Sequence, residues 1–414
     1  MSGTIHIDSM RRIDRWAGVP LCWFATLLLR LWQAVRRKAP RPVRRILFIE
    51  LSEMGSTILA DPAMRKARER TGAECYFAIF AQNADSLSFT GTIAPSNIFT
   101  VRTGSLFQLA IDTLALLAWT RRNAIDTVVD FELFSRFTAL LSGFAGADRR
   151  IGFYRFNNEG LYRGEMLTHR VVYNPHIHIA KNFIALIDAL LSATPTVPYS
   201  KTLIGDEQLA IKARPPSEPA RERIKAQIQT LVPDRDISKL RLTLVNPNAS
   251  DLLPQRRWMP ENFGELIRRM LTAREDVLIV ITGAPSEREE ADQLAARCGS
   301  DRCISFAGRS ALTDLPALYS LAEVMVSNDT GPAHFAACTG LPTVVLFGPE
   351  TPSLYGPLGS AIPIYAGLAC SPCVNVSNHR KSPCRDNVCM RSISVDQVFK
   401  AVDDVLKAKM RTPA

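Results

Sequence analysis

The stretch Ser327–Pro349, which reads SNDTGPAHFAACTGLPTVVLFGP, constrains the fold more than any other part of the chain. It begins at the end of a short apolar run, Glu323–Ser327, and the cap and turn residues Asn328–Pro332 stop that run. A second apolar run follows at Pro342–Phe347. The pattern predicts a buried strand, a turn, a helix and a second strand, which together make one βαβ unit.

The turn in this unit has the residues of an anion-binding site. Thr330 suits a helix N-cap and Pro332 suits the first helical turn. Gly331 between them leaves backbone N–H groups open to an anion at the positive end of the helix. His334 falls in the first turn on the same side, and Gly340 is predicted to end the helix. We therefore expect a phosphate to bind at this turn.

A second strand-to-turn junction lies near the amino terminus. The apolar strand Arg45–Glu50 leads into Leu51–Thr57 and then into a helical pattern that continues through Arg70. No G-x-G-x-x-G follows the strand, and the sequence contains no G-x-x-x-x-G-K-[ST]. The junction is Rossmann-like, but dinucleotide-binding and P-loop functions lose their main support.

Strands and helices alternate along the whole chain, which predicts an α/β fold with mostly parallel sheets. Two such halves facing a central cleft form the GT-B architecture. The predicted divisions are an arm at 1–44, a Rossmann-like acceptor domain at 45–195, a linker at 196–240, a Rossmann-like nucleotide-sugar domain at 241–393, and a helix and tail at 394–414. Further predicted strands are Glu74–Phe80, Ile98–Val101, Ile125–Phe131, Arg149–Phe153, Arg170–Tyr173, Leu242–Asn246, Val277–Thr282, Cys303–Phe306 and Ile362–Tyr365.

The positive charge is concentrated at one end of the chain. The 414 residues carry a net charge of +10, of which the first 45 contribute +8 through ten basic and two acidic side chains. The remainder has 40 basic and 38 acidic side chains, a net charge of +2. A nearly neutral body argues against nucleic acid as a partner, whereas a basic amino-terminal arm favours an anionic membrane surface.

The arm contains an apolar segment, Trp16–Trp32, that is aromatic at both ends and interrupted by Pro20 and Arg30. It is too short to span a bilayer comfortably, but an aromatic, Arg-flanked helix of this length can lie in the membrane interface. We expect peripheral attachment to the inner face of the cytoplasmic membrane. A secretory signal and a helix packed on its own protein are the alternatives. The flanking basic residues are Arg11, Arg12, Arg15, Arg36, Arg37 and Lys38.

Nine cysteines in a chain of this length do not indicate a disulfide scaffold. Four of them, Cys370, Cys373, Cys384 and Cys389, lie in a polar loop that also contains His379. They could hold a structural zinc ion, remain reduced or form disulfides. The D-x-D motif at Asp234–Asp236 is interpreted as a solvated turn, so we expect no metal or other cofactor to be required.

Two ordered motifs carry a family resemblance. D-T-G-P-x-H-x-A-A at Asp329–Ala337, followed by F-G-P-x-x-P at Phe347–Pro352, resembles the carboxy-terminal signature of glycosyltransferase family 9, the ADP-heptose:lipopolysaccharide heptosyltransferases. Asn246–Ser250 and Arg256–Phe263 resemble the family's N-P-G-A-x and basic-x-W-P-x-x-x-F segments. The resemblance implies an inverting, metal-independent transferase that uses a nucleotide-diphosphate sugar.

The resemblance also implies a set of donor-binding residues. Arg256 aligns best with the family's diphosphate-binding lysine, with Arg257 as the near alternative. Gly283 belongs to a turn that holds the nucleoside, and Glu287 could receive ribose hydroxyls or cap a helix. Asp329 would orient the sugar. The implied set is Asn246, Arg256, Gly283, Glu287, Asp329, Thr330, Gly331 and His334.

On the acceptor side the sequence departs from the family. The family pattern L-S-x-x-G-D is matched at Leu51, Ser52 and Gly55, but Ser56 stands where the family has the aspartate proposed as general base. Serine alone cannot take a proton at neutral pH, so Glu53 is the expected substitute and Asp61 a weaker one. The predicted catalytic residues are Glu53, Ser56 and Asp329.

Two more residues were assigned to the acceptor side from their position after a strand. Glu132 and Arg136 follow the strand that ends near Asp130, where ligands of α/β proteins usually bind. A capped helix start is the alternative explanation. Together with Gly55 they complete the predicted acceptor side.

The leading hypothesis is transfer of a heptose or related sugar from a donor, which we expect to be ADP-linked, to lipopolysaccharide or another cell-surface glycan. A non-catalytic nucleotide-sugar-binding scaffold and a sugar-nucleotide epimerase are the alternatives. The amphipathic helix Val395–Lys409 is expected to pack back on the first domain, as such tails often do in GT-B proteins.

Overall fold

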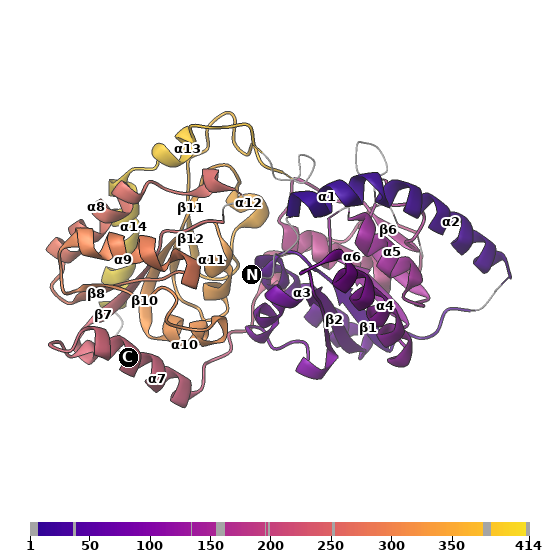
Figure 1. Ribbon diagram of the computed structural model, residues 1–414, viewed down its shortest axis with the longest axis horizontal. Coiled ribbons are helices and arrows are strands. Elements are labelled where there is room, and N and C mark those ends of the chain that lie inside the picture. Colours follow the sequence, from indigo (N-terminus) through magenta and orange to yellow (C-terminus); the bar gives the residue numbers. More distant parts are fainter. Residues whose placement is uncertain are drawn as a thin grey trace. The chain divides into compact units, whose positions relative to one another are not determined.

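The computed structural model describes residues 7–35, 39–133, 135–154, 162–194, 196–197, 199–250, 253–375 and 382–410. The chain forms two compact units, Met1–Ala210 and Ile211–Ala414. Each unit contains one six-stranded sheet (Figure 1). Every strand pairing in both sheets is parallel, as the alternating sequence pattern predicts.

The first sheet has the strand order β3-β2-β1-β4-β5-β6. Its central strands β1 and β4 are mostly apolar and, apart from Arg45, buried, because helices cover both faces of the sheet. The order reverses between β1 and β4, which is where open α/β sheets bind ligands. The strands are β1 (Arg45–Ile49), β2 (Glu74–Phe80), β3 (Ile98–Val101), β4 (Thr127–Asp130), β5 (Arg149–Phe153) and β6 (His169–Val171).

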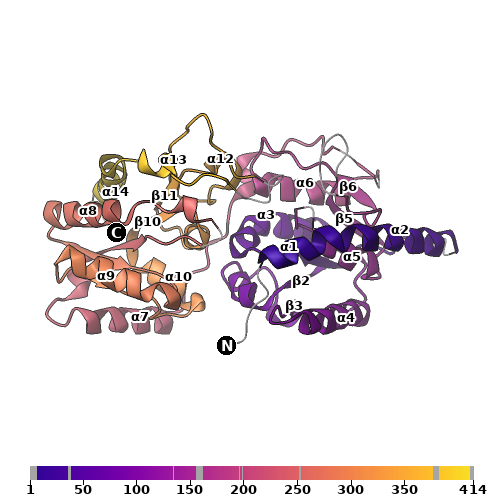
Figure 2. The same ribbon diagram turned by 45° about the horizontal axis from the view of Figure 1, so that its top comes forward.

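The helices of the first unit form two layers. α3 (Met54–Thr71) and α6 (Ile179–Leu191) pack against each other on one face of the sheet. Right-handed crossovers place α4 (Leu106–Arg122) and α5 (Arg136–Phe144) on the opposite face, because they lead from β3 and β4 in the other direction along the sheet. α2 (Gly18–Val35) packs beside α5 and extends that second layer (Figure 2).

The arm folds as two helices, α1 (Ile7–Trp16) and α2, with the break at Ala17. Pro20, which interrupts the apolar run in the sequence, lies in the first turn of α2, where its missing N–H costs no helical hydrogen bond. One stripe of α2 is buried against Ala139 and Met166 of the first unit. The buried side chains of that stripe are Cys22, Ala25, Thr26 and Leu29.

The other side of the arm is apolar and open to solvent. Trp16 is 79% exposed and Leu31 67%, and the large apolar residues between them on this side are also exposed. One side of the arm is therefore packed on the protein, as one of the alternatives states, and attachment of the exposed side to a membrane stays a prediction. No helix in the described ranges is long and apolar enough to cross a bilayer. Residues 1–6 and the basic residues Arg36, Arg37 and Lys38 lie outside the described ranges.

The second sheet has the order β12-β11-β10-β7-β8-β9 and reverses between β7 and β10. Its strands are β7 (Arg241–Asn246), β8 (Val277–Ile281), β9 (Cys303–Ser305), β10 (Ala322–Asn328), β11 (Thr343–Phe347) and β12 (Ala361–Tyr365). Its helices are α7 (Glu218–Leu231), α8 (Pro260–Ala273), α9 (Arg288–Cys298), α10 (Leu315–Ser320), α11 (Gly331–Ala337), α12 (Pro352–Tyr355), α13 (Val388–Arg391) and α14 (Val395–Met410).

The final helix packs differently from the expectation. Val398, Val402 and Leu406 of α14 are buried in the core of the second unit, where α14 lies against α8 and β10. The apolar stripe of an amphipathic helix is satisfied by the nearest apolar sheet face, so α14 completes the unit that precedes it. The prediction that it packs back on the first domain was wrong.

A buried ion pair in the first unit offers a test of the fold. Asp130 and Arg163 are fully buried and in direct contact, and Thr138 donates a hydrogen bond to the same carboxylate. Asp130→Asn leaves the Arg163 charge buried without its counter-ion, so we expect the free energy of unfolding to fall by about 3–5 kcal/mol. Urea unfolding followed by circular dichroism measures the loss.

The matched control is Asp206→Asn. Asp206 also pairs with a basic side chain, Lys181 at 2.7 Å, but it is 88% exposed. Its loss should leave the urea midpoint unchanged. Equal effects of the two substitutions would contradict the importance of burial for the Asp130–Arg163 pair.

Candidate active site

The predicted donor-side residues come together at the carboxyl ends of the second sheet. β7 ends at Asn246, β10 at Asn328 and β11 at Phe347, and parallel pairing brings these ends to one edge. The loops that follow them carry Arg256, Asp329 and Glu350. Because the strand order reverses between β7 and β10, this edge is the position where such sheets bind ligands.

Two buried asparagines form hydrogen bonds that hold the loops at this edge in place. Asn246 donates from its amide nitrogen to Thr282 Oγ1 at 3.1 Å, linking the ends of β7 and β8. Asn328 donates to the Pro247 carbonyl at 2.8 Å and accepts from the Trp258 backbone N–H at 3.1 Å. The amide of Asn246 thus holds a strand end, and Asn328, which the sequence analysis did not assign to the site, fixes the loop that leads to Arg256.

Arg256 lies between two carboxylates from different loops. Its Nη2 is 2.8 Å from Glu350 Oε1, its Nε is 3.5 Å from Asp329 Oδ2, and Nη1 donates to the Asp329 carbonyl at 3.3 Å. The side chains of Asp329 and Glu350 are 5% and 2% exposed, whereas that of Arg256 is 19% exposed. Arg256 therefore pairs with two buried carboxylates from different loops, as buried charges in proteins usually require.

This arrangement separates Arg256 from its neighbour Arg257. Arg257 donates from Nε and Nη2 to the Ala249 carbonyl, at 3.1 and 2.8 Å. Its guanidinium braces the backbone of the preceding loop, whereas that of Arg256 meets the acidic residues at the strand ends. Glu350 was missed from the sequence because nothing near Pro349 indicates a long-range ion-pair partner.

The turn after β10 has the predicted cap but a shorter helix. Thr330 is extended at the N-cap position, and its side chain donates to the Asn328 carbonyl at 3.3 Å instead of capping α11. α11 ends at Ala337, and Gly340, at φ +73°, belongs to the turn beyond it, so the predicted helix end at Gly340 was wrong. A two-turn helix adds little dipole, so an anion here would depend on individual N–H groups. His334 is buried in the same helix.

Gly283 and Glu287 form a tight turn after β8. A Cβ atom at Gly283 would lie 2.8 Å from the Asn248 amide nitrogen and 3.1 Å from Glu287 Oε2. Glu287 Oε2 accepts from the Ala284 backbone N–H at 2.6 Å, which satisfies a donor at the start of the following helix. The capping explanation of Glu287 is confirmed, and its contact with a ribose stays a prediction.

The four-cysteine loop packs directly beside these loops. Cys373 and Val374 donate backbone N–H groups to the Pro349 carbonyl, and Gln255 donates to the Cys384 carbonyl at 3.0 Å. None of these four cysteines forms a disulfide, and Cys370 is exposed whereas Cys389 is buried. In the described ranges no three His, Cys, Asp or Glu side chains converge as metal ligands, and His379 lies outside those ranges. A structural zinc ion stays a prediction.

At the reversal point of the first sheet, Glu132 holds the loop after β1. One oxygen of its carboxylate, Oε1, accepts from the Leu51 N–H at 2.9 Å, the Ser52 N–H at 3.0 Å and the Ser52 hydroxyl at 2.9 Å. Burial raises the pKa of Glu132, the charges of Asp130 and Glu53 raise it further, and the Ser52 hydrogen bond opposes them.

Glu53 and Ser56 are in direct contact at the start of α3. Glu53 is the extended N-cap residue, and its Oε2 accepts from the Ser56 hydroxyl at 3.2 Å. Gly55 lies in the same first turn. Ser56 has no carboxylate, but the Glu53 carboxylate is in hydrogen-bond contact with it. Glu132 supplies a second carboxylate in the same group of loops.

Two other predicted residues have mainly structural contacts. Arg136 is buried, donates from Nε to the Tyr162 carbonyl and pairs with Asp14 of α1 at 3.2 Å, and Ser135 caps its helix. Asp61 is 1% exposed and pairs with Arg65 at 2.8 Å. The capped helix start is confirmed for Arg136, and Asp61 is too enclosed to reach an acceptor.

Two Rossmann-like units whose loops gather at the carboxyl ends of parallel sheets define the GT-B class of glycosyltransferase folds. A sequence model of glycosyltransferase family 9 (heptosyltransferase) matches residues 121–382. The chain belongs to glycosyltransferase family 9.

Individual relatives agree with this assignment. Lipopolysaccharide heptosyltransferase 2 of Salmonella typhimurium is 29% identical over 108 residues, 25% of this chain and 30% of that protein, so the match spans under a third of the relative. The structure of E. coli ADP-heptose lipopolysaccharide heptosyltransferase II has a TM-score of 0.68 at 20% identity and covers 88% of this chain and 99% of that one. E. coli heptosyltransferase WaaC with ADP has a TM-score of 0.60 at 16% identity and covers 87% and 99%.

The ion cluster at the second sheet predicts a stability effect. Arg256→Ala removes the guanidinium that pairs with the buried carboxylates of Asp329 and Glu350, so the free energy of unfolding should fall by about 2–4 kcal/mol. Arg257→Ala removes the hydrogen bonds to the Ala249 carbonyl and should cost about 1 kcal/mol. Both values come from denaturant unfolding without ligand.

A double variant checks the cause. Adding Glu350→Gln to Arg256→Ala removes one of the two buried carboxylate charges. The double variant should therefore lose less free energy of unfolding than the sum of the two single variants. Additive losses would show that the cluster is not electrostatically coupled.

Proposed function

We propose that this protein is an inverting glycosyltransferase that moves a heptose or a related sugar from an ADP-linked donor to lipopolysaccharide or another cell-surface glycan. The observation that carries the proposal is the family 9 signature at Asp329–Pro352, which supplies the Asp329 and Glu350 carboxylates around Arg256 at the ligand-binding edge of the second sheet. The ADP-linked donor is favoured because similar folds have been solved with ADP and with ADP-2-deoxy-2-fluoro heptose.

In the proposed reaction an acceptor hydroxyl attacks the anomeric carbon of the donor sugar. The bond from that carbon to the diphosphate oxygen breaks, ADP leaves with the bonding electron pair, and the configuration inverts. Donors aimed at the leaving diphosphate lower this barrier most. Arg256, Thr330, the Gly331 N–H and His334 are the candidate donors, and Asp329 orients the sugar.

Arg256 would change partners during such a cycle. Its guanidinium carries a fork of donors that suits a phosphate as well as a carboxylate. When a diphosphate binds, the fork can turn from Glu350 and Asp329 towards the ligand. The released carboxylates would then be free to accept sugar hydroxyls, which couples donor binding to sugar orientation.

The acceptor proton goes to a carboxylate in the first unit. Glu53 is the proposed base because it occupies the strand-to-helix turn of the family's catalytic aspartate and touches Ser56, the residue at that aspartate's own position. Ser56 positions the Glu53 carboxylate, and Glu132 holds the backbone of the same loop. Metal is not needed in this scheme, because the charge is stabilised by side chains and N–H groups.

Substitution of Glu53 tests the assignment of the base. Glu53→Gln keeps the size and the hydrogen bond to Ser56 but cannot take a proton, so the rate of sugar transfer should fall about 10²–10⁴-fold with little change in donor affinity. The assay follows labelled sugar from ADP-heptose into lipopolysaccharide. Ser56→Ala should cost less, and Ser56→Asp, which restores the family residue, should rescue Glu53→Gln.

Glu132→Gln is the matched control. It keeps an oxygen for the Leu51 and Ser52 N–H groups and should lower the rate less than about tenfold. A large loss with Glu132→Gln and none with Glu53→Gln would make Glu132 the base. A wild-type protein that binds ADP-heptose and never transfers it would favour the scaffold alternative.

We also propose that the arm attaches the protein to the cytoplasmic face of the membrane. Its open side carries aromatic and aliphatic side chains, and Arg12 and Arg15 on α1 are exposed beside it. Such a helix gains free energy from burying apolar area at the acyl boundary and from anionic lipid headgroups. This location would bring the enzyme to a lipid-linked acceptor.

Deleting the arm would be an unsuitable test, because α1 supplies Asp14 to Arg136 and α2 covers Ala139. The better variant is Phe24→Ser/Leu28→Ser/Leu31→Ser, which changes only exposed positions. It should move the protein from membrane to soluble fractions with an unchanged melting temperature, because each side chain contributes about 1.5–3 kcal/mol when buried.

The control is Leu203→Ser. Leu203 is 95% exposed but lies away from the arm in the sequence. It should leave membrane binding unchanged. A triple variant that still sediments fully with membranes would overturn attachment through α2.

A further inference from the structure

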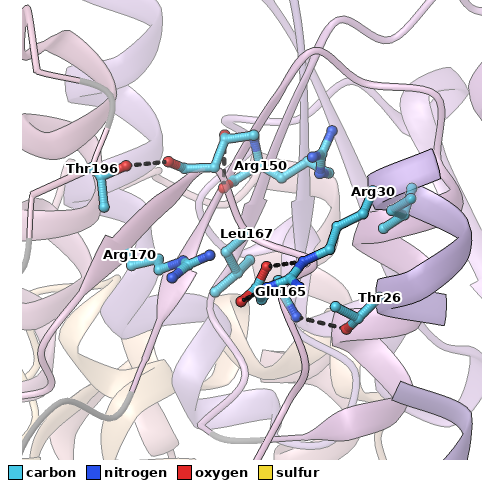
Figure 3. Close-up of a pocket in the computed structure, with 9 residues that line it drawn as sticks. Thr26, Arg30, Arg150, Glu165, Leu167, Arg170 and Thr196 are labelled. Atoms are coloured by element: carbon cyan, nitrogen blue, oxygen red, sulfur yellow. Dashed lines mark hydrogen bonds and ion pairs between the residues drawn. The ribbon is translucent and has the colours of Figure 1, made fainter. Parts of the chain in front are cut away.

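A polar pocket of about 230 Å³ opens between α2 and the edge of the first sheet. Three arginines line it, Arg30 from α2, Arg150 from β5 and Arg170 from β6, together with one acidic residue, Glu165 (Figure 3). At about 30 Å³ per water molecule, the volume corresponds to roughly seven waters, which is room for a tetrahedral anion and its substituent. The lining carries a net charge of +2.

Arg150 is the unusual member of this group. It is only 5% exposed, yet within the described part of the chain it has no carboxylate in contact. Its Nε and Nη1 donate to the carbonyls of Met166 and Ala147, at 2.6 and 2.7 Å. The acidic residue in its field, Asp148, is hydrogen-bonded to Arg41 instead. Buried charges in proteins are normally paired, so this guanidinium lacks an anion.

Arg170 points into the same pocket and is also without an acidic contact among the described residues. Its guanidinium carbon lies 4.9 Å from the centre of the Tyr154 ring, which orients it without neutralising it. Arg30 and Glu165 form a bidentate pair at 2.9 and 2.6 Å across the mouth (Figure 3). Glu165 therefore pairs with Arg30, and among the described residues Arg150 and Arg170 have no carboxylate in contact.

The pKa of the neighbouring His169 is affected by the positive charges of the arginines. Burial, together with the charges of Arg149 and Arg150, lowers the pKa of His169 to about 4. His169 is thus neutral at physiological pH and neither adds to nor offsets the charge of the pocket. The excess positive charge comes from Arg150 and Arg170.

The pocket is separate from the proposed catalytic loops. Its lining includes neither Glu53 nor Glu132. Arg150 and Arg170 come from β5 and from the edge strand β6, whereas Glu53 and Glu132 follow β1 and β4, and β6 lies two strands from β4. One wall of the pocket is formed by α2, the helix whose outer side is apolar and exposed to solvent. α4, in the same helical layer, also exposes large apolar residues: Leu106, Phe107, Ile111 and Leu114.

We propose that this pocket binds the phosphate of an anionic phospholipid headgroup from the membrane on which α2 lies. The proposal rests on the membrane attachment proposed above, because that attachment places lipid phosphates beside the mouth. Arg150 and Arg170 hold the phosphate oxygens, Thr168 and Thr196 border the headgroup, and the acyl chains follow the apolar side of α2. The site anchors the first unit at a defined depth.

Binding of dihexanoylphosphatidylglycerol to the full-length protein tests the site without a membrane. This lipid is soluble as a monomer below its micellar concentration, and isothermal titration calorimetry measures its affinity. Arg170→Gln should weaken binding at least tenfold, as expected for a lost charge-assisted contact. Glu165→Gln removes the competing carboxylate and should strengthen binding.

Arg122→Gln is the control for charge alone, because it removes one exposed positive charge from α4, outside the pocket. It should leave the affinity unchanged. Equal weakening by Arg170→Gln and Arg122→Gln, or no binding by the wild-type protein, would overturn the proposal. Inorganic phosphate binding as tightly as the lipid would identify a free-phosphate site instead, which also overturns it.

Vesicles separate this proposal from the attachment itself. The vesicles are phosphatidylcholine with roughly 30 mol% phosphatidylglycerol, which represents the anionic fraction of a charged leaflet. On these vesicles the Arg170→Gln variant should bind more weakly than the Arg122→Gln variant. The Phe24→Ser/Leu28→Ser/Leu31→Ser variant should lose vesicle binding and keep the affinity for the short-chain lipid. The opposite result, loss of short-chain lipid binding in that variant, would contradict a pocket formed by the arginines.

Discussion

Parallel pairing is the constraint on which the rest of this structure depends. In each sheet every strand runs in the same direction, so the loops that follow the strands all emerge at one edge. Residues as distant in sequence as Arg256 and Glu350 can then form an ion pair, and Glu132 can hold the backbone of Ser52. The chemistry of both units follows from this convergence, because none of their loops contains a complete site by itself.

Much of the fold could be predicted from the sequence because buried parallel strands are continuous apolar runs. β2, β3 and β5 have the predicted bounds, and the other predicted strands differ by one or two residues at their ends. The candidate site was only partly predictable. Local motifs identified Arg256 and Asp329, but the partner Glu350 and the anchoring Asn328 make their contacts over long sequence separations. Such contacts leave no periodic pattern.

The amino-terminal arm also shows what cannot be predicted from the sequence. Its composition indicated a membrane surface, and composition cannot distinguish the stripe that packs on Ala139 from the side that remains open. The role of Asp14 at the start of α5 depends on a partner more than 100 residues away. The departure at Ser56 is a different case, since the sequence already offers Glu53 three residues earlier, and the structure adds the hydrogen bond between the two side chains.

The double-sided arm has a consequence for how the protein is made. α2 leaves the ribosome well before Ala139 and Met166, the residues that bury its inner stripe. At synthesis rates of about 5–20 residues per second, that interval is on the order of ten seconds. For that time the inner stripe of the helix lacks the residues that bury it in the folded unit, so both sides of the helix are open to any apolar surface that it meets. The proposed attachment of the arm to a membrane would then precede the folding of the first unit and fix the place where that unit folds.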